Sequence, residues 1–257
     1  MNQREQNLKI VVLSGGHSQT HIILNSLKKK AEIFSIEIED DYGRMNRNRY
    51  KRYGFIKGLG QKLFIKFAKR QKQRSKKRID EIIDSFHMIT TVNPPDRTIF
   101  DIHDESLPQT INSQQPDLIV LNCASIIPLG LLDALQAPVL NVHAGITPLY
   151  RGLFGAYWAL RDDNHHLIGS TIHKVDRGID TGEVLNQTFF SVTKNDNFST
   201  YHYLHLAYSL KGLHEVLDYY RTHNQLPEPV ETDLESKLRT HPTLYGYLFY
   251  RLFKGIK

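Results

Sequence analysis

Short apolar runs alternate with helical patterns along the chain, and this alternation limits the fold more than any other feature of the sequence. Residues 8–13 (LKIVVL) and 117–122 (DLIVLN) are almost continuously apolar, as strands are when both faces of their sheet are covered. A Ser-Gly-Gly turn at residues 14–16 precedes a helical pattern. The remaining strands are predicted at residues 32–38, 87–92, 138–144, 168–175 and 183–192. The sequence therefore predicts an α/β, Rossmann-like fold with a mostly parallel sheet and helices on both faces.

The length of 257 residues suits one large domain with a short appendage. We expect this domain to span residues 1–223, to contain a basic helical insertion at residues 44–86, and to be followed by a short C-terminal tail at residues 224–257. The last long helix is predicted at residues 199–223. Residues 226–241 are rich in Pro, Glu, Asp and Thr, and are expected to cross the surface.

Composition excludes several classes of protein. The chain is 40% hydrophobic and 23% charged, and no apolar run approaches the ~20 residues that a membrane-spanning helix needs. The amino terminus is polar and has no signal-peptide pattern, which favours a cytoplasmic location. The single cysteine, Cys123, excludes an internal disulfide framework and is expected to be a buried, inert thiol.

The net charge of +6 is unevenly distributed. Residues 44–78 contain 15 Lys and Arg and no Asp or Glu, so the remainder carries 18 basic against 27 acidic residues. Residues 53–86 have helical periodicity, with apolar positions predicted to share one face: Phe55, Leu59, Leu63, Phe67, Ile79, Ile82 and Ile83. The simplest interpretation is an amphipathic helix that packs through this stripe and leaves its cations in solvent. The alternatives are docking of residues 44–78 on an anionic membrane at its inner face, and contact with RNA or a substrate phosphate.

Three polar side chains form the most informative pattern. Asn141 and His143 are separated by one residue on a predicted strand, so their side chains share one face. Asp180 lies in a turn rich in Asp and Gly that is able to bring a carboxylate to the same point. Transfer of an acyl group to an amine needs a donor for the developing oxyanion and a group that moves a proton. An amide, an imidazole and a carboxylate together supply both.

These residues and their flanking turns resemble the formyltransferase family of folate-dependent enzymes. The resemblance rests on the Asn-x-His pair, on Pro148 and the Tyr-Arg-Gly turn at 150–152, and on the Asp-x-Gly-x-Asp-Thr-Gly loop at 176–182. It covers roughly residues 8–192 and identifies residues 44–78 as an insertion. It implies that Asn141, His143 and Asp180 are catalytic, with 10-formyltetrahydrofolate as co-substrate and no metal.

The resemblance also implies binding residues. In the family, a loop of small and apolar residues lines the folate pocket largely through its backbone, and here that loop contains Ser125, Ile126 and Ile127. The folate contacts expected from the second loop are Asp176, Arg177 and Gly178. Substrate contacts are expected from the early turn, which resembles a phosphate-binding glycine turn, and from the second turn: Ser14, Gly15, Gly16, Tyr150, Arg151 and Gly152.

The acceptor suggested by the resemblance is the amino group of a nucleotide-linked amino sugar. Residues 144–148 (AGITP) depart from the Ser-Leu-Leu-Pro pattern of many relatives in the loop that faces the amine, which leaves the acceptor open. The alternatives are a glycinamide ribonucleotide or methionyl-tRNA type of formyltransferase, and a non-catalytic adaptor that binds RNA or membrane. Too few residues follow residue 182 for a tRNA-binding domain, so nucleic acid is not the expected partner. Apolar surface on the tail and last helix is consistent with a homodimer.

The remaining histidines have simpler explanations. His173, on a predicted strand, is either a core histidine or a residue that faces the site. The pairs His17 with His21, and His202 with His205, have spacings that a helix could use to bind a metal. No acidic or thiolate third ligand follows them closely in sequence, so we expect these four to be surface histidines.

Overall fold

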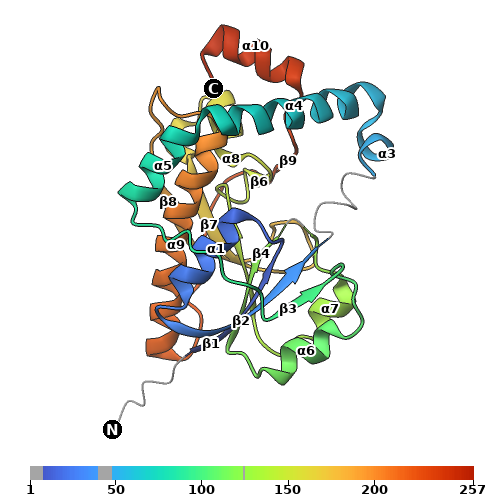
Figure 1. Cartoon of the computed structure of the whole chain (residues 1–257), viewed down its shortest axis with the longest axis vertical. Helices are drawn as coiled ribbons and strands as arrows, with labels where there is room; N and C mark the ends of the chain where they lie inside the picture. Colours follow the sequence, from blue (N-terminus) through green and yellow to red (C-terminus); the bar gives the residue numbers. More distant parts are fainter. Residues whose placement is uncertain (1–7, 40–47, 124) are drawn as a thin grey trace.

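The computed structural model describes residues 8–39, 48–123 and 125–257, and it contains one seven-stranded sheet (Figure 1). The strands lie in the order β3-β2-β1-β4-β5-β7-β8. The first five strands in this order, from β3 to β5, are parallel to one another. Strand β7 is antiparallel to β5, and β8 is antiparallel to β7. The predicted fold class is confirmed. The bounds are β1 Leu8–Ser14, β2 Ala31–Ile38, β3 Arg97–Ile99, β4 Leu118–Asn122, β5 Val139–His143, β7 Gly169–Lys174 and β8 Val184–Phe189.

Helices cover both faces of the sheet, which explains why its central strands are continuously apolar. Along β1, Ile10 and Val12 join one buried cluster while Val11 and Leu13 join the other, because successive side chains point to opposite faces. The first cluster lies under α1 Ser18–Leu27, α8 Gly155–Arg161 and α9 Phe198–His223, and the second under α6 Leu107–Ser113 and α7 Leu129–Ala134. A 3-10 helix, η1, spans His165–Leu167. No helix in the described ranges is both long and apolar enough to cross a bilayer.

The strand predicted at residues 87–92 is wrong. The third strand of the sheet, β3, begins only at Arg97, after Pro94 and Pro95. The carbonyl groups of Ile89 and Thr91 accept hydrogen bonds from the Asn25 side chain rather than from a neighbouring strand. The segment therefore joins no strand of the sheet, and a side chain satisfies part of its backbone.

The basic insertion forms α3 Arg49–Tyr53, α4 Phe55–Arg74 and α5 Lys76–Ser85 (Figure 1). Residues 44–47 of the predicted insertion lie outside the described residues. Phe64 anchors α4: its fully buried ring lies 5.5 Å from the ring of Phe154, 5.1 Å from Phe198 and 5.7 Å from Tyr247. The insertion is thus packed on α8, α9 and the C-terminal segment by one aromatic cluster.

The stripe predicted to pack on the domain does so only in part: Phe67, Ile79 and Ile82 pack there, whereas its first members, on α4, do not. Phe55, Leu59 and Leu63 were expected to face the domain, but they are 72%, 39% and 46% exposed. The buried face instead carries Gln61 and Phe64. The helix has apolar side chains on two sides, and only the positions of α9 and α10 decide which side is covered.

The segment expected to be a C-terminal tail packs against the domain. Strand β9 Leu238–Arg239 pairs in parallel with β6 Arg151–Gly152, and the final helix, α10 Leu244–Lys254, buries Tyr247 completely. The indole Nε1 of Trp158 donates to the Thr240 carbonyl at 3.1 Å. Residues 238–241 therefore do not simply cross the surface, because backbone pairing and this indole hold them beside the Tyr-Arg-Gly turn.

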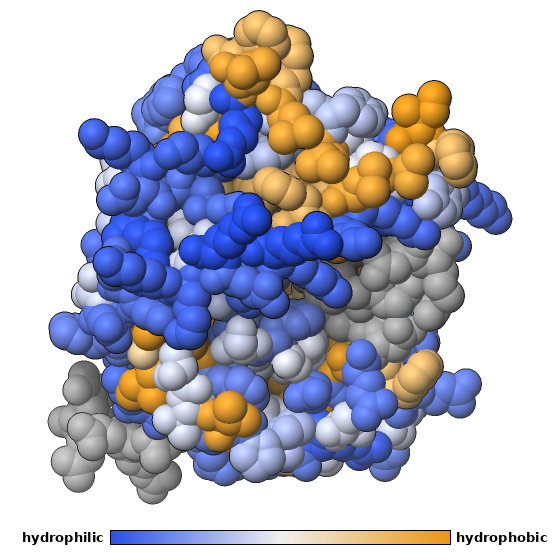
Figure 2. All heavy atoms as spheres, turned by 45° about the horizontal axis from the view of Figure 1, so that its top comes forward, coloured by the Kyte–Doolittle hydropathy of each residue, from blue (hydrophilic) through white to orange (hydrophobic). Residues whose placement is uncertain are grey.

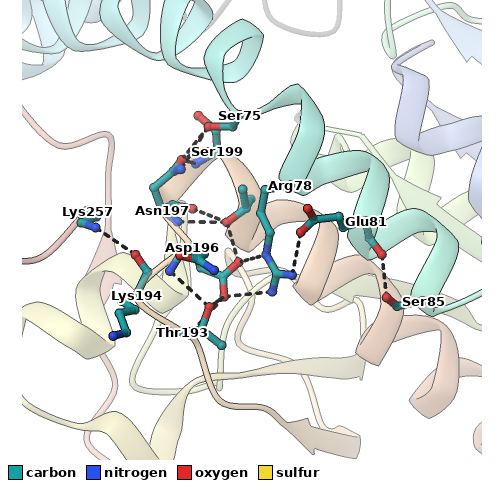
Figure 3. Close-up of polar contacts among 12 residues, drawn as sticks. Ser75, Arg78, Glu81, Ser85, Thr193, Lys194, Asp196, Asn197, Ser199 and Lys257 are labelled. Carbon is teal, nitrogen blue, oxygen red and sulfur yellow. Dashed lines mark hydrogen bonds and ion pairs between the residues drawn. The ribbon is translucent and has the colours of Figure 1, made fainter.

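A polar network ties the start of α5 to the start of α9 (Figure 3). Arg78 Nε donates to Asp196 Oδ1 at 2.8 Å, and the Asp196 side chain is fully buried. Asn197 caps α9 by accepting from the Ser199 N–H at 2.9 Å, and its amide donates to Ser75 Oγ at 3.0 Å. Burial opposes ionisation of Asp196, but hydrogen bonds from Arg78 and Thr193 outweigh it and hold the pKa of this carboxyl below its ordinary value.

Replacing Asp196 by Ala is expected to destabilise the fold by about 1–3 kcal/mol, because it removes the buried acceptor of the Thr193 N–H and of Arg78. Asp80→Ala, which removes an exposed pair with Lys76, is the matched control and should cost under ~1 kcal/mol. Urea denaturation measures both. Since the pKa of Asp196 is lowered on folding, its contribution is complete above about pH 4 and is lost as the pH falls through the folded-state value. Equal losses in the two variants would contradict this role.

Candidate active site

A cleft of about 320 Å³ opens at the carboxyl ends of the parallel strands. Strand β1 lies between β2 and β4. The chain passes from β1 to β2 in one direction across the sheet and from β4 to β5 in the other, so the strand order reverses between β1 and β4. Open parallel sheets place their ligand sites at such a switch in strand order. Asn122 at the end of β4 and Asn141 near the end of β5 line the cleft, together with residues of the loop after β7. The sheet therefore fixes one wall of the cleft.

Asp180 lies at the centre of the site and gathers its neighbours. Its Oδ1 accepts from the Asn141 amide at 3.0 Å, and its Oδ2 accepts from the Gly152 backbone N–H at 2.8 Å. The same Oδ2 lies 3.5 Å from His143 Nδ1. The three residues predicted to act together, although 39 positions apart in sequence at their extremes, do converge on one point.

His143 is held with a defined proton arrangement. Its Nε2 lies 2.8 Å from the Tyr150 carbonyl oxygen, which only accepts, so Nε2 carries the proton and Nδ1 keeps its lone pair beside Asp180. Gly145 permits this approach, because a Cβ there would lie 2.5 Å from the same carbonyl oxygen. The local backbone thus fixes the orientation of the imidazole.

The two ionisable groups have shifted pKa values. Burial lowers the pKa of the His143 imidazole, although the nearby Asp180 carboxylate opposes the shift. Burial works in the opposite sense on Asp180, but His143 and hydrogen bonds that include the Gly152 N–H hold the pKa of the carboxyl well below its ordinary value. At neutral pH, the site therefore contains a carboxylate beside an imidazole whose Nδ1 is free to take a proton.

His173 also faces this centre. Its Nδ1 donates to the Lys174 carbonyl at 2.6 Å, which leaves Nε2 to accept from the Asn141 amide at 3.2 Å. Of the two interpretations of His173, the structure favours the one that faces the site, although the ring is only 2% exposed. Both N–H groups of Asn141 are therefore engaged, one by Asp180 and one by His173.

The donor set resembles a metal site but fits one poorly. Ligand atoms of His143, His173 and Asp180 lie within 4.8 Å of one another. The Asn141 amide nitrogen, however, lies between His173 and Asp180 and directs its hydrogen atoms at them. A cation at this point would need to displace a donor that two of the three ligands already bind. The residues fit a hydrogen-bonded site better than a metal centre.

The residues predicted to bind folate line one end of the cleft: Ser125, Ile126, Ile127, Asp176, Arg177 and Gly178. Ala124, within the same loop, lies outside the described residues. Cys123 also lines this end and is partly exposed, so it is not the buried thiol expected from the sequence. Asp176 accepts from the Gly178 N–H at 2.9 Å and from Thr181 Oγ1 at 2.6 Å, which holds the loop that presents Asp180.

Of the six residues predicted to bind substrate, only Gly152 lines the cleft. Tyr150 is buried and Arg151 donates to the Ile179 carbonyl at 3.1 Å, so both support the site from behind. Ser14, Gly15 and Gly16 do not line the cleft in this structure. The position of a Cβ on Gly16 would be 2.5 Å from a Glu37 carboxylate oxygen, an environment that opposes an anion.

A second group of residues that line the cleft was not predicted from sequence, and we call the part that they form the second end of the cleft. They come from α3, from α9 and from the C-terminal segment: Arg49, Arg52, Tyr53, His202, Leu238, Arg239, Thr240 and His241. Nothing in the local pattern of residues 238–241 identifies them as site residues. The cationic composition of residues 44–78 did allow for contact with a substrate phosphate, which is the one signal that anticipated this end.

The expectation that His202 and His205 lie on the surface is wrong. His205 is 3% exposed, accepts from the Ala156 N–H at 3.3 Å and lies 3.1 Å from Ser170 Oγ. Burial lowers the pKa of His202 to about 4, with Lys72 acting in the same direction. The first half of helix α9 packs against the sheet and the insertion, so polar residues there such as His205 and Ser209 lie in the interior.

Comparison with known proteins gives a consistent result. The formyl transferase family model matches residues 66–217, a range that contains Asn141, His143 and Asp180. The methionyl-tRNA formyltransferase of Syntrophomonas wolfei is 32% identical over 127 residues, which is 49% of this chain and 40% of that protein. The chain therefore spans less than half the length of the curated relatives it matches.

Solved structures share the fold. A 4-N formyltransferase from Francisella tularensis matches with a TM-score of 0.57 and 15% identity, over 91% of this chain and 76% of that one. HypX from Aquifex aeolicus in complex with tetrahydrofolic acid matches with a TM-score of 0.56 and 14% identity, over 92% and 30%. At such identities, the likeness is one of fold.

NMR titration of the imidazole protons tests the electrostatics of the site. The pKa of His143 should lie below the ordinary ~6.5. It should fall further in Asp180→Asn, because the carboxylate favours the charged imidazole and its removal leaves burial unopposed. Asp133→Asn, which changes an exposed carboxylate paired with Arg177, should leave the His143 titration unchanged. A higher pKa in the Asp180 variant would show that Asp180 does not act on His143 as described.

Proposed function

The chain belongs to the formyl transferase family, and we propose that it is an enzyme that moves a formyl group from 10-formyltetrahydrofolate to an amine. The observation that carries this proposal is the convergence of Asn141, His143 and Asp180 in one cleft. The apolar loop of Ser125, Ile126 and Ile127 beside them suits a flat, partly apolar pteridine ring. The tetrahydrofolic acid complex of HypX, which shares the fold, supports the same donor.

Each of the three residues has a task in the proposed reaction. The acceptor nitrogen forms a bond to the formyl carbon and the bond from that carbon to folate N10 breaks. Asn141 exchanges its bond to His173 for one to the developing oxyanion. His143 Nδ1 takes the proton that the amine loses and returns it to N10, while Asp180 stabilises the imidazolium in between. Held together, these groups replace a bimolecular aminolysis by an effectively unimolecular step.

We infer a phosphorylated acceptor from the second end of the cleft, lined by α3, His202 and residues 238–241, which we call the acceptor end. Arg52 lines this end, is exposed, and forms no ion pair with the residues that the structure describes. Arg239, in contrast, is paired with Asp162 and buried against Trp158. A cation that is free to bind an anion at the mouth of the cleft suits the phosphates of a nucleotide-linked amino sugar.

Two other acceptors remain in competition. Methionyl-tRNA is supported by the names of the curated relatives, whereas a sugar N-formyltransferase from Shewanella among the solved structures supports the amino sugar. Glycinamide ribonucleotide is disfavoured by the Glu37 carboxylate beside the early glycine turn. Incubation with 10-formyltetrahydrofolate and each acceptor class, followed by measurement of released tetrahydrofolate, discriminates among them. No turnover with any amine would refute the enzymatic proposal.

Substitution of the central residues tests their tasks. Asn141→Ala, His143→Ala and Asp180→Ala are each expected to lower kcat by at least ~10²-fold, the usual size of an oxyanion or acid–base contribution. His166→Ala, which removes an exposed imidazole, is the control and should keep the wild-type rate. Circular dichroism establishes that each variant is folded. Near-wild-type rates in the His143 and Asp180 variants would exclude them from catalysis.

A second comparison tests the acceptor's phosphate. Arg52→Ala should raise the KM for a nucleotide-linked amine about ten-fold, the loss of one charge-assisted contact, with little change in kcat. Lys51→Ala removes a neighbouring exposed cation that does not line the cleft, and its KM should stay near wild type. If both variants raise KM equally, general charge and not a specific phosphate contact is responsible.

A further inference from the structure

Exposed apolar side chains are concentrated on two helices. Of the 18 large apolar side chains exposed in the described part of the chain, nine lie on α4 and α10. We call these nine the apolar face: Phe55, Ile56, Leu59, Leu63, Tyr245, Leu248, Phe249, Leu252 and Phe253. Leu252 and Phe253 are 78% and 69% exposed. A contiguous apolar surface of this kind marks a site of interaction, because isolated proteins seldom leave such surfaces in water.

The two helices form one surface. A Cβ on Gly60 of α4 would lie 2.7 Å from the Tyr245 ring, so the helices approach closely at this point. Beneath them, Phe64 and Phe67 pack on Tyr247 at ring distances of 5.7 and 5.5 Å. Figure 2 shows apolar side chains in a band that runs across this side of the molecule, bordered by hydrophilic ones. The apolar face is therefore supported by a packed layer below it.

Unpaired cations border the apolar face. Lys62, Lys66, Lys69 and Arg70 are exposed on α4, and none forms an ion pair within the described ranges. The sequences of α4 and α10 contain no Asp or Glu at all. An apolar stripe flanked by Lys and Arg without acidic partners is the pattern of helices that lie in the interface of an anionic bilayer.

We propose that α4 and α10 together dock this protein on an anionic lipid surface. The nine apolar side chains enter the interface between headgroups and acyl chains, and the cations of α4 bind the lipid phosphates. Charge complementarity selects this partner over a second copy of the chain. A two-fold dimer through this face would bring two cationic surfaces together with no acidic residue on either helix to pair them.

Docking connects the surface to the cleft. Helix α3, which contributes Arg49, Arg52 and Tyr53 to the acceptor end, leads directly into α4 through Gly54. The residues that are proposed to bind the acceptor and those proposed to bind lipid thus lie on one continuous segment. Docking does not depend on the proposed formyl transfer, and binding and turnover are measured separately.

Co-sedimentation of the full chain with vesicles tests the proposal. The protein should sediment with vesicles that contain phosphatidylglycerol in phosphatidylcholine, and should stay in the supernatant with phosphatidylcholine alone. Raising the salt concentration should weaken the binding, because dissolved ions screen the attraction between the lipid phosphates and the Lys and Arg side chains.

Matched variants separate the two contributions. Leu252→Ser with Phe253→Ser should reduce binding to the anionic vesicles at least ~10-fold, and so should Lys66→Gln with Arg70→Gln. Phe100→Ser, which changes an equally exposed ring outside α4 and α10, and Lys211→Gln on α9 should bind as wild type does. All of these side chains are exposed, so the variants should unfold at the wild-type temperature and retain turnover of a dissolved acceptor.

Four outcomes would overturn the inference. The first is absence of wild-type binding to anionic vesicles. The second is equal loss in the control variants. The third is a concentration-dependent dimer, seen by analytical ultracentrifugation, that Leu252→Ser with Phe253→Ser abolishes, since the apolar face would then be occupied by a second copy. Binding of single-stranded RNA that competes fully with vesicles would likewise assign the cations to another partner.

Discussion

The buried carboxylate of Asp180 is the constraint on which the arrangement of the site depends. A charge removed from water must be met by donors, and Asp180 obtains them from the Asn141 amide and the Gly152 N–H. Those donors belong to strand β5 and to the turn that forms β6, whereas Asp180 belongs to the loop after β7. Gly152 adds a further link, because its φ of 88° and the 2.1 Å from its Cβ position to the Arg239 carbonyl oxygen admit only glycine. One carboxylate thus joins three segments and, through Gly152, the C-terminal strand β9.

The two ends of the cleft have different structural origins. The proposed folate end is built from strand ends and the loops that follow them, all of which lie within the residues matched by the family model. The acceptor end is built largely from α3 and from residues 238–241, which lie outside the matched range of 66–217. Such a division is expected if members of the family share the formyl donor but differ in the amine that accepts the formyl group. It also explains why the family of the chain is established while the identity of its amine remains a proposal.

Predictions from sequence succeeded where one local pattern has one structural solution. Continuous apolar runs require a sheet covered on both faces, and residues two positions apart on a strand share a face. Both the fold class and the pairing of Asn141 with His143 therefore followed directly. They failed where two solutions compete. The segment at 87–92 has the composition of a strand but pairs with none. Helix α4 has apolar residues on two sides, and Phe55, Leu59 and Leu63 of the predicted stripe are exposed. His205 resembled a surface residue because the pattern of α9 gives no sign that Ala156, Ser170 and Phe190 enclose its ring.

The sequence by itself determined the family, the α/β sheet and the three polar residues at its centre, because these depend on short-range spacing and on the carboxyl ends of strands. Only the tertiary structure decided which side of α4 is buried, that His173 engages Asn141, and that residues 238–241 return to complete the cleft. The physical reason is the same in each case. Burial and hydrogen bonding between distant segments depend on which surfaces meet. The pattern of one segment shows which of its faces is apolar, but not which other segment packs against that face.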